Sequence, residues 1–145
     1  MDETRTVRER RRGILGELMA LRDPQARFQW AVERARSRPA LPEAMRTENC
    51  RVSGCQVRLW WVAVLDGGRW RFASDSDAAT LKAMTGLLAE CYDGETSEGI
   101  LADPPEWLEK SGLLRQLAEN RRATVLRVAE SMIAGARREL GPAAV

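Results

Sequence analysis

The sequence predicts an α+β domain in which a small antiparallel sheet of about three strands packs against several helices. An apolar, aromatic run from Val57 to Leu65 is followed by the turn sequence Asp66-Gly67-Gly68 and by an alternating run from Arg69 to Ala73. Apolar residues at helical spacing lie on both sides of this hairpin. The order of helices, sheet and further helices is typical of an α+β fold.

The sheet is expected to have one face in contact with solvent. Trp70 and Phe72 share one face of their strand, whereas the arginines between them point the other way. Trp60 and Trp61 are adjacent, so they are expected on opposite faces, one in the core and the other near the functional site. Residues 51–53 are expected to add a short third strand.

Two helices are expected before the sheet. The first covers residues 6–20, and its run Arg8-Glu9-Arg10-Arg11-Arg12 is interpreted as a solvated face because an acid interrupts it. The second covers residues 24–37, with Asp23 as its N-cap and Pro24 at the first helical position. Prolines 39 and 42 then begin a loop that runs to the first cysteine.

The helices after the sheet follow from capping residues and glycines. The segment Ser74-Asp75-Ser76-Asp77 is rich in side chains that cap helices, and Asp93-Gly94 is typical of a helix end. Helices are expected over residues 78–92, 96–101, 113–117 and 120–140.

Length and composition restrict the class of protein. The 145 residues are expected to form one domain, 1–145, with a basic N-terminal segment over residues 1–12. A net charge of +2 gives no electrostatic case for nucleic acid or a membrane surface, and no apolar run is long enough to span a bilayer. Three cysteines, an odd number, fit a reducing compartment, so a cytoplasmic location is expected.

The chain contains no histidine, which excludes whole classes of site. A Ser-His-Asp or Cys-His catalytic pair cannot be built, and neither can a histidine-containing zinc site. A reactive cysteine must therefore work without an imidazole base.

Cys55 is the candidate for such chemistry. It follows Gly54 at a turn just before a predicted strand, and Arg51 and Arg58 supply nearby positive charge that favours a thiolate. From the residues alone, a nucleophilic thiol and a cysteine that fills the start of a strand are equally good interpretations.

The other two cysteines have plainer interpretations. Cys91 shares a helix face with leucines and is expected in the core. Cys50 is either an inert thiol or one that resolves an oxidised Cys55. The Cys-x₄-Cys spacing of Cys50 and Cys55 also occurs in metal and cluster sites, but the sequence offers few further ligands.

Several motifs in order resemble the SufE/CsdE family of sulfur-acceptor proteins. The similarity extends from about Trp30 to about Ala136 and includes Leu41-Pro42, Arg51-Val52-Ser53-Gly54-Cys55-Gln56 with Leu59-Trp60, Phe72-Ala73-Ser74-Asp75-Ser76-Asp77-Ala78, Tyr92-Asp93-Gly94-Glu95-Thr96 and Leu117-Ala118-Glu119-Asn120-Arg121. The chain departs from the family pattern at Val57, where serine is usual, at Ala83, where glycine is usual, and after Arg121. These departures concern partner specificity and loop geometry rather than the thiol.

The resemblance implies a fold like that of the iron–sulfur scaffold IscU and a role in sulfur transfer. Family members take persulfide sulfur from a PLP-dependent cysteine desulfurase, stimulate that enzyme, and pass the sulfur to an iron–sulfur assembly scaffold. Cys55 would be the persulfide carrier. The chain would be an accessory protein rather than a stand-alone enzyme, with no cofactor or metal of its own, because PLP belongs to the desulfurase.

The resemblance also implies supporting residues. Arg121 would stabilise charge near Cys55 or form a surface salt bridge, Gln56 would orient the loop, and Gly54 would permit the turn. At least one of Asp75 and Asp77 is expected to cap a helix, with contact to the desulfurase as the alternative. The thiol is expected to rest in a partly buried, apolar pocket, since a persulfide in open water is lost to thiols and oxidants.

Two other functions compete with this one. The chain could be an iron–sulfur or metal-binding scaffold that uses Cys50, Cys55 and carboxylates. It could also be a non-catalytic interaction module with the same fold and a different partner.

Overall fold

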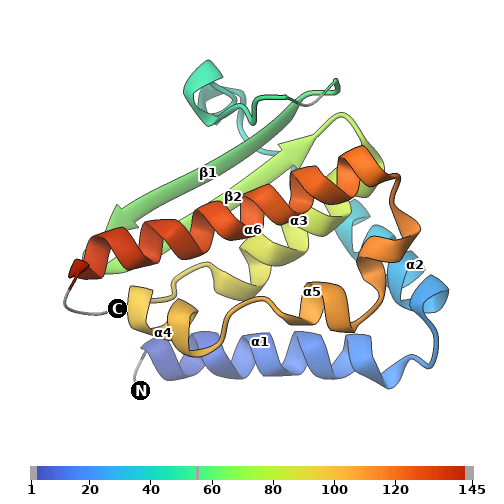
Figure 1. Ribbon diagram of the computed structural model, residues 1–145, viewed down its shortest axis with the longest axis horizontal. Helices are drawn as coiled ribbons and strands as arrows, with labels where there is room; N and C mark the ends of the chain where they lie inside the picture. The colour runs from blue at the N-terminus through green and yellow to red at the C-terminus, as the bar shows by residue number, and fades with distance from the viewer. Residues whose placement is uncertain (1–2, 55, 143–145) are drawn as a thin grey trace.

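A β-hairpin and a set of helices make up the described part, residues 3–54 and 56–142, of a computed structural model of this protein (Figure 1). Strands β1 (Leu59–Asp66) and β2 (Arg69–Ser76) pair antiparallel, from Leu59 opposite Ser76 to Asp66 opposite Arg69. Gly67 and Gly68 both have positive φ in the turn between them, as the sequence predicts. The α+β class is thus confirmed.

Six α-helices are present in the described part of the chain. They are α1 (Glu3–Ala20), α2 (Pro24–Arg36), α3 (Ala79–Tyr92), α4 (Ser97–Ala102), α5 (Trp107–Lys110) and α6 (Glu119–Leu140). Short 3₁₀ turns are η1 (Glu43–Met45), η2 (Glu48–Cys50) and η3 (Leu113–Gln116). None of the described helices is both long and apolar enough to cross a membrane.

Helix α3 forms the centre of the core. It is buried on almost every side, because the hairpin, α1, α2 and α6 all contact it (Figure 1). A helix that is apolar all round is stable only in such a position. Its leucines, Met84 and Tyr92 pack against apolar side chains of the surrounding elements. This arrangement lets α6 lie beside the hairpin, where the candidate site forms.

The N-terminal cap of α2 is as expected. The Asp23 side chain accepts a hydrogen bond from the Ala26 N–H at 2.8 Å, and Pro24 begins the helix. An N-cap carboxylate satisfies one of the N–H groups that a helix start leaves unpaired.

The predicted third strand is wrong for the described residues, which contain a two-stranded sheet. Arg51 forms only an isolated bridge with Trp60, and the Val52 N–H donates to the Leu59 carbonyl at 2.9 Å. The 3₁₀ turn η2 ends just before this contact, and Gly54, at φ 79°, turns the chain soon after it. The chain therefore touches the sheet edge too briefly to form a strand.

The prediction that Asp75 or Asp77 caps a helix is also wrong, because neither side chain caps α3. Strand β2 continues through Ser76, and α3 begins after Ala78 with no side-chain cap. Pairing with β1 and the burial of Asp75 outweigh the tendency of this segment to cap a helix, so the segment continues the strand. The Ser76 hydroxyl instead accepts a hydrogen bond from the Ala78 N–H at 3.1 Å.

Asp75 holds the loop after α2 against the sheet. Its carboxylate accepts hydrogen bonds from the N–H groups of Leu41 and Ser76 and from Arg46, and Lys82 lies 3.6 Å away. Burial by itself would raise the pKa of Asp75, but these donors and charges outweigh it and hold the pKa below the ordinary value of 3.8. The charged form of Asp75 therefore stabilises the folded state.

Replacing Asp75 with asparagine is expected to lower the free energy of unfolding at pH 7 by about 1–3 kcal/mol. Because the folded pKa lies below the unfolded one, this contribution is complete above pH 3.8 and disappears as the pH falls through the folded pKa. Urea unfolding at pH 7 and at pH 3 measures the difference. The matched control is Asp77→Asn, since Asp77 forms an exposed pair with Arg58 and its loss is expected to change stability by less than about 0.5 kcal/mol. An Asp75→Asn deficit that stays constant down to pH 3 contradicts the assignment.

The basic run in α1 differs from the prediction at one residue. Arg8, Arg10 and Arg12 are exposed, as expected for a solvated face, but Arg11 is fully buried. Its guanidinium pairs with Glu95 at 2.9 Å and with Asp103 at 2.7 Å. Burial lowers the pKa of Arg11, but the hydrogen bonds to both carboxylates raise it above its ordinary value, so this cation stays charged. The run thus anchors α1 to the segment that follows α3.

The outer edge of β2 is covered by the same segment. The Trp70 N–H donates to the Glu95 carbonyl at 2.8 Å, and the Gly94 N–H donates to the Trp70 carbonyl at 2.7 Å. The Trp70 indole N–H also donates to the Ser97 hydroxyl at 2.9 Å. These contacts fix the position of the hairpin against α4.

Candidate functional site

The residues on either side of Cys55 in the sequence lie against one face of α6. The Arg127 Nη2 donates to the Ser53 carbonyl at 3.4 Å, and Gln56 lines a small hollow together with Arg121. Cys55 itself lies outside the described residues, and so does its expected apolar pocket.

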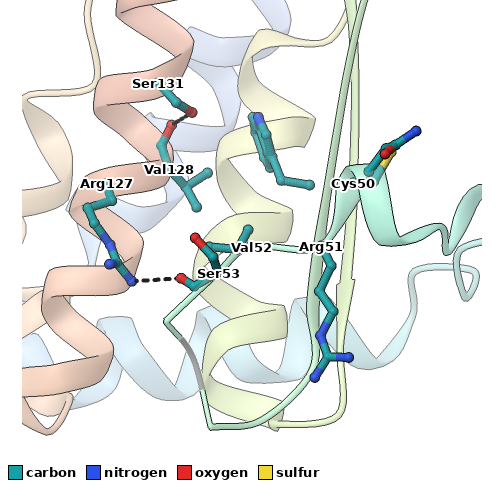
Figure 2. A pocket seen from close by; sticks show the side chains of 9 residues that line it. Cys50, Arg51, Val52, Ser53, Arg127, Val128 and Ser131 are labelled. Carbon is teal, nitrogen blue, oxygen red and sulfur yellow. Dashed lines mark hydrogen bonds between the residues drawn. The ribbon is translucent and has the colours of Figure 1, made fainter.

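A hollow of about 340 Å³ lies on the Ser53 side of this loop. Val52, Trp61 and Val128 form apolar parts of its wall, and Arg127 and Ser131 supply polar groups. In Figure 2, Arg127 and Ser53 point toward one another, whereas Arg51 and Cys50 lie away from Arg127. The hollow therefore has a cationic end beside the loop.

A second, smaller hollow of about 50 Å³ lies on the other side of Gly54. Its lining combines loop residues with the first turns of α6: Gly54, Gln56, Val57, Asn120, Arg121 and Thr124. Three of the predicted supporting residues, Gly54, Gln56 and Arg121, thus meet here. Their roles at Cys55 stay predictions.

The backbone conformation at Gly54 favours glycine. Its φ of 79° is a conformation that residues with a side chain rarely adopt. A Cβ added to it would also lie 3.2 Å from the Nη1 of Arg127, closer than side chains normally approach. The positive φ therefore favours glycine here, and a larger residue would also have to displace the end of the exposed Arg127 side chain.

The arginines near the loop differ in how they are neutralised. Arg58 pairs with Asp77 at 2.7 Å, and Arg51 lies 3.6 Å from the exposed Glu48. Arg121 donates to the Thr80 hydroxyl at 2.8 Å, and Arg127 donates to the Thr124 hydroxyl at 3.2 Å. Within residues 3–54 and 56–142, neither Arg121 nor Arg127 has a carboxylate partner.

The structure modifies what the sequence suggests about charge near Cys55. The sequence suggests that Arg58 favours a thiolate at Cys55, but Asp77 compensates the charge of Arg58. Asp77, a predicted supporting residue, thus forms an ion pair with Arg58. Arg127 was not expected at the site. Its signal was present in the sequence, because Arg121, Thr124 and Arg127 recur at helical spacing, but the spacing alone does not say which loop this face contacts.

The other cysteines lie in apolar surroundings. Cys91 is completely buried in α3, as predicted, and burial together with the charge of Glu90 raises the pKa of its thiol to about 12. Cys50 is half-buried and packs against the small cluster of Leu41, Trp60 and Val62. Both interpretations of Cys50, as an inert thiol and as one that resolves an oxidised Cys55, stay predictions.

The two tryptophans point to opposite faces of β1, as predicted. Trp60 is buried in the small cluster, where Arg46 lies over its ring at 5.0 Å. Trp61 stacks on Phe72 with ring centroids 5.3 Å apart and lines the larger hollow. Of the two tryptophans, Trp61 is therefore the one that lies near the functional site.

Metal ligands do not gather in the described part of the chain. No three Cys, Asp or Glu side chains among residues 3–54 and 56–142 form a group that could hold a metal ion. The site instead presents guanidinium groups, hydroxyls and an indole ring. These groups suit an anionic or polarisable reactant.

Comparisons with known proteins match most of the chain. A family model described as "SufE: Fe-S metabolism associated domain" matches residues 12–136. The sulfur acceptor protein CsdE of Escherichia coli is 28% identical over 98 residues, which cover 66% of this chain and 67% of CsdE. An uncharacterised SufE-like protein of Rhizobium etli is 29% identical over 126 residues, which cover 81% of this chain and 85% of that protein.

A solved structure and a longer enzyme are also similar. The solution structure of a hypothetical protein from Thermus thermophilus has a TM-score of 0.69 and 28% identity, and the match covers 90% of this chain and 96% of that one. The chloroplastic quinolinate synthase of Arabidopsis thaliana is 36% identical over 81 residues, but the match spans only 11% of that enzyme. The extent of the family match shows that this chain belongs to the SufE family.

Proposed function

We propose that this protein accepts a sulfur atom on Cys55 from the persulfide of a PLP-dependent cysteine desulfurase and stimulates that enzyme. The observation that carries the proposal is the SufE-family match over residues 12–136, a range that includes Cys55, and the similarity to the sulfur acceptor protein CsdE supports it. The proposed recipient is an iron–sulfur assembly scaffold, since the family domain is associated with Fe–S metabolism.

The proposed reaction is an exchange between sulfur atoms. The Cys55 thiolate attacks the outer sulfur of the donor persulfide, a new S–S bond forms, and the old S–S bond breaks. The donor cysteine leaves as a thiolate, so no external oxidant or reductant is needed. A thiolate is a strong nucleophile and the S–S bond is weak, so the reaction needs ionisation and access rather than a histidine base.

The surroundings of the loop support this chemistry. The guanidinium groups of Arg121 and Arg127 lie beside loop residues, and positive charge favours both a thiolate and an anionic persulfide. The apolar wall formed by Val52, Trp61 and Val128 suits a polarisable sulfur atom.

The proposal assigns this chain an accessory role without a cofactor of its own. PLP would remain with the desulfurase, and this chain would carry sulfur between two proteins. We place it in the cytoplasm, because a thiol carrier must be kept reduced between cycles.

Intact-mass measurement tests the proposal directly. After incubation with a purified cysteine desulfurase and cysteine, the wild-type protein is expected to gain about 32 Da per transferred sulfur, and dithiothreitol is expected to remove it. No gain with a desulfurase that is itself active refutes the acceptor role. An iron–sulfur absorption band after anaerobic reconstitution, without any mass gain, supports the scaffold alternative instead.

A further inference from the structure

The two hollows beside the loop share an unusual charge pattern. Three arginines, Arg51, Arg121 and Arg127, line them, and no carboxylate of the described residues does. The groove on the opposite flank of α6 is different, since Glu106, Glu109 and Glu130 line it with Arg137. Since Arg51 lies near Glu48, the uncompensated positive charge on the loop side of α6 comes from Arg121 and Arg127.

Arg127 has N–H donors that are free to bind an anionic partner. A guanidinium has five N–H donors, and the acceptors found for Arg127 in the described structure, Ser53 and Thr124, are both bound through Nη2. The Nε and Nη1 groups therefore keep free N–H donors, and each can donate a charge-assisted hydrogen bond to a carboxylate.

The exposure of Arg127 decides what kind of carboxylate fits. An ion pair at an exposed site strengthens binding by a factor of about five at most, which is too little to hold a small free acid. A carboxylate that belongs to a protein surface is held by the rest of the interface, which also excludes water from the pair.

We infer that Arg127 binds an aspartate or glutamate side chain of the protein that delivers sulfur to this chain. The inference rests on the proposed function, because it takes the sulfur donor as the partner. Pairing at Arg127, next to Ser53 and Gly54, would align the donor with the loop and would draw on a guanidinium that the fold leaves without a carboxylate partner in residues 3–54 and 56–142.

Charge reversal measures the predicted contribution. The Arg127→Glu variant is expected to lower kcat/KM for sulfur transfer from a purified cysteine desulfurase by roughly ten-fold, through a higher KM for the acceptor. The control Arg137→Glu makes the same change of net charge on the other flank of α6 and is expected to stay within about two-fold. The salt dependence of kcat/KM is expected to be weaker for Arg127→Glu than for the wild type or for Arg137→Glu.

Thiol alkylation separates docking from a structural role. If Arg127 only holds the Ser53 carbonyl, its replacement changes the loop and hence the iodoacetamide alkylation rate of Cys55 without any partner. We expect that rate to remain within about two-fold of wild type in Arg127→Glu. A change in alkylation as large as the change in transfer overturns the inference.

Crosslinking identifies the partner group. The chain has only two lysines, Lys82 and Lys110, so few amines compete for a carbodiimide crosslink to carboxylates. The Arg127→Lys variant is expected to form an amide with an aspartate or glutamate of the desulfurase at position 127, as located by peptide mass spectrometry. A crosslink absent there, or transfer by Arg127→Glu equal to that by Arg137→Glu, overturns the inference. A wild-type protein that gains no sulfur refutes the proposed function itself.

Discussion

Replacing Cys55 with serine is expected to abolish the acquisition of persulfide sulfur from a cysteine desulfurase. A serine hydroxyl is not ionised at neutral pH and is a far weaker nucleophile than a thiolate toward an S–S bond. The measurement is intact mass after incubation with desulfurase and cysteine, together with the initial rate of desulfurase turnover, which is expected to return to the rate without an acceptor.

The other two cysteines supply matched controls for this experiment. Cys91→Ser is a poor choice because it places a hydroxyl in the core, so Cys91→Ala is preferred. With a pKa raised to about 12, the Cys91 thiol is ionised at pH 7 in only about one molecule in 10⁵, so its removal is expected to leave sulfur transfer unchanged. Cys50→Ser tests whether Cys50 resolves an oxidised Cys55. Persulfide on Cys55→Ser at wild-type level would refute the assignment of the carrier.

Replacing Arg11 with methionine is expected to lower the free energy of unfolding by about 3–5 kcal/mol. The change leaves Glu95 fully buried without its cation and removes the Arg11–Asp103 pair. It also removes the guanidinium that lies 4.7 Å above the Tyr92 ring. Urea unfolding followed by circular dichroism measures the effect.

Two further variants test whether the uncompensated charge of Glu95 causes this loss of stability. Arg12→Met alters the adjacent exposed arginine and is expected to change stability by less than about 0.5 kcal/mol. The double variant Arg11→Met with Glu95→Gln removes the uncompensated charge, so it is expected to recover part of the loss. A single variant Arg11→Met as stable as Arg12→Met contradicts the buried network.

The parts of the fold that follow from short-range rules could be predicted. Asp23 and Pro24 begin a helix through capping chemistry, and Gly67 with Gly68 makes the hairpin turn through positive φ. Cys91 could be placed in the core from helical periodicity alone. Each of these depends on neighbours within a few residues in the sequence.

The parts that depend on distant partners could not be predicted. Arg11 is buried because Glu95 and Asp103, more than eighty residues away, neutralise it, and nothing in its own helix distinguishes it from exposed Arg12. The segment around Asp75 has capping residues, yet cross-strand pairing and contacts from Leu41 and Arg46 place it in the sheet.

The candidate site shows the same division. The sequence motif identifies the loop that carries Cys55, and the family resemblance assigns Arg121 to it. Neither identifies Arg127, because its place at the site comes from the packing of α6 against Ser53 and Gly54, which a periodic pattern does not specify.

The cover over the outer edge of β2 has a consequence for behaviour at high concentration. An unpaired strand edge is a template on which a second molecule can add its own strand, and such additions start aggregation. Here the Trp70 backbone N–H and carbonyl are already bound by Glu95 and Gly94, so a neighbouring molecule finds them occupied. The same two hydrogen bonds that position the hairpin thus also block the addition of a second molecule's strand at Trp70.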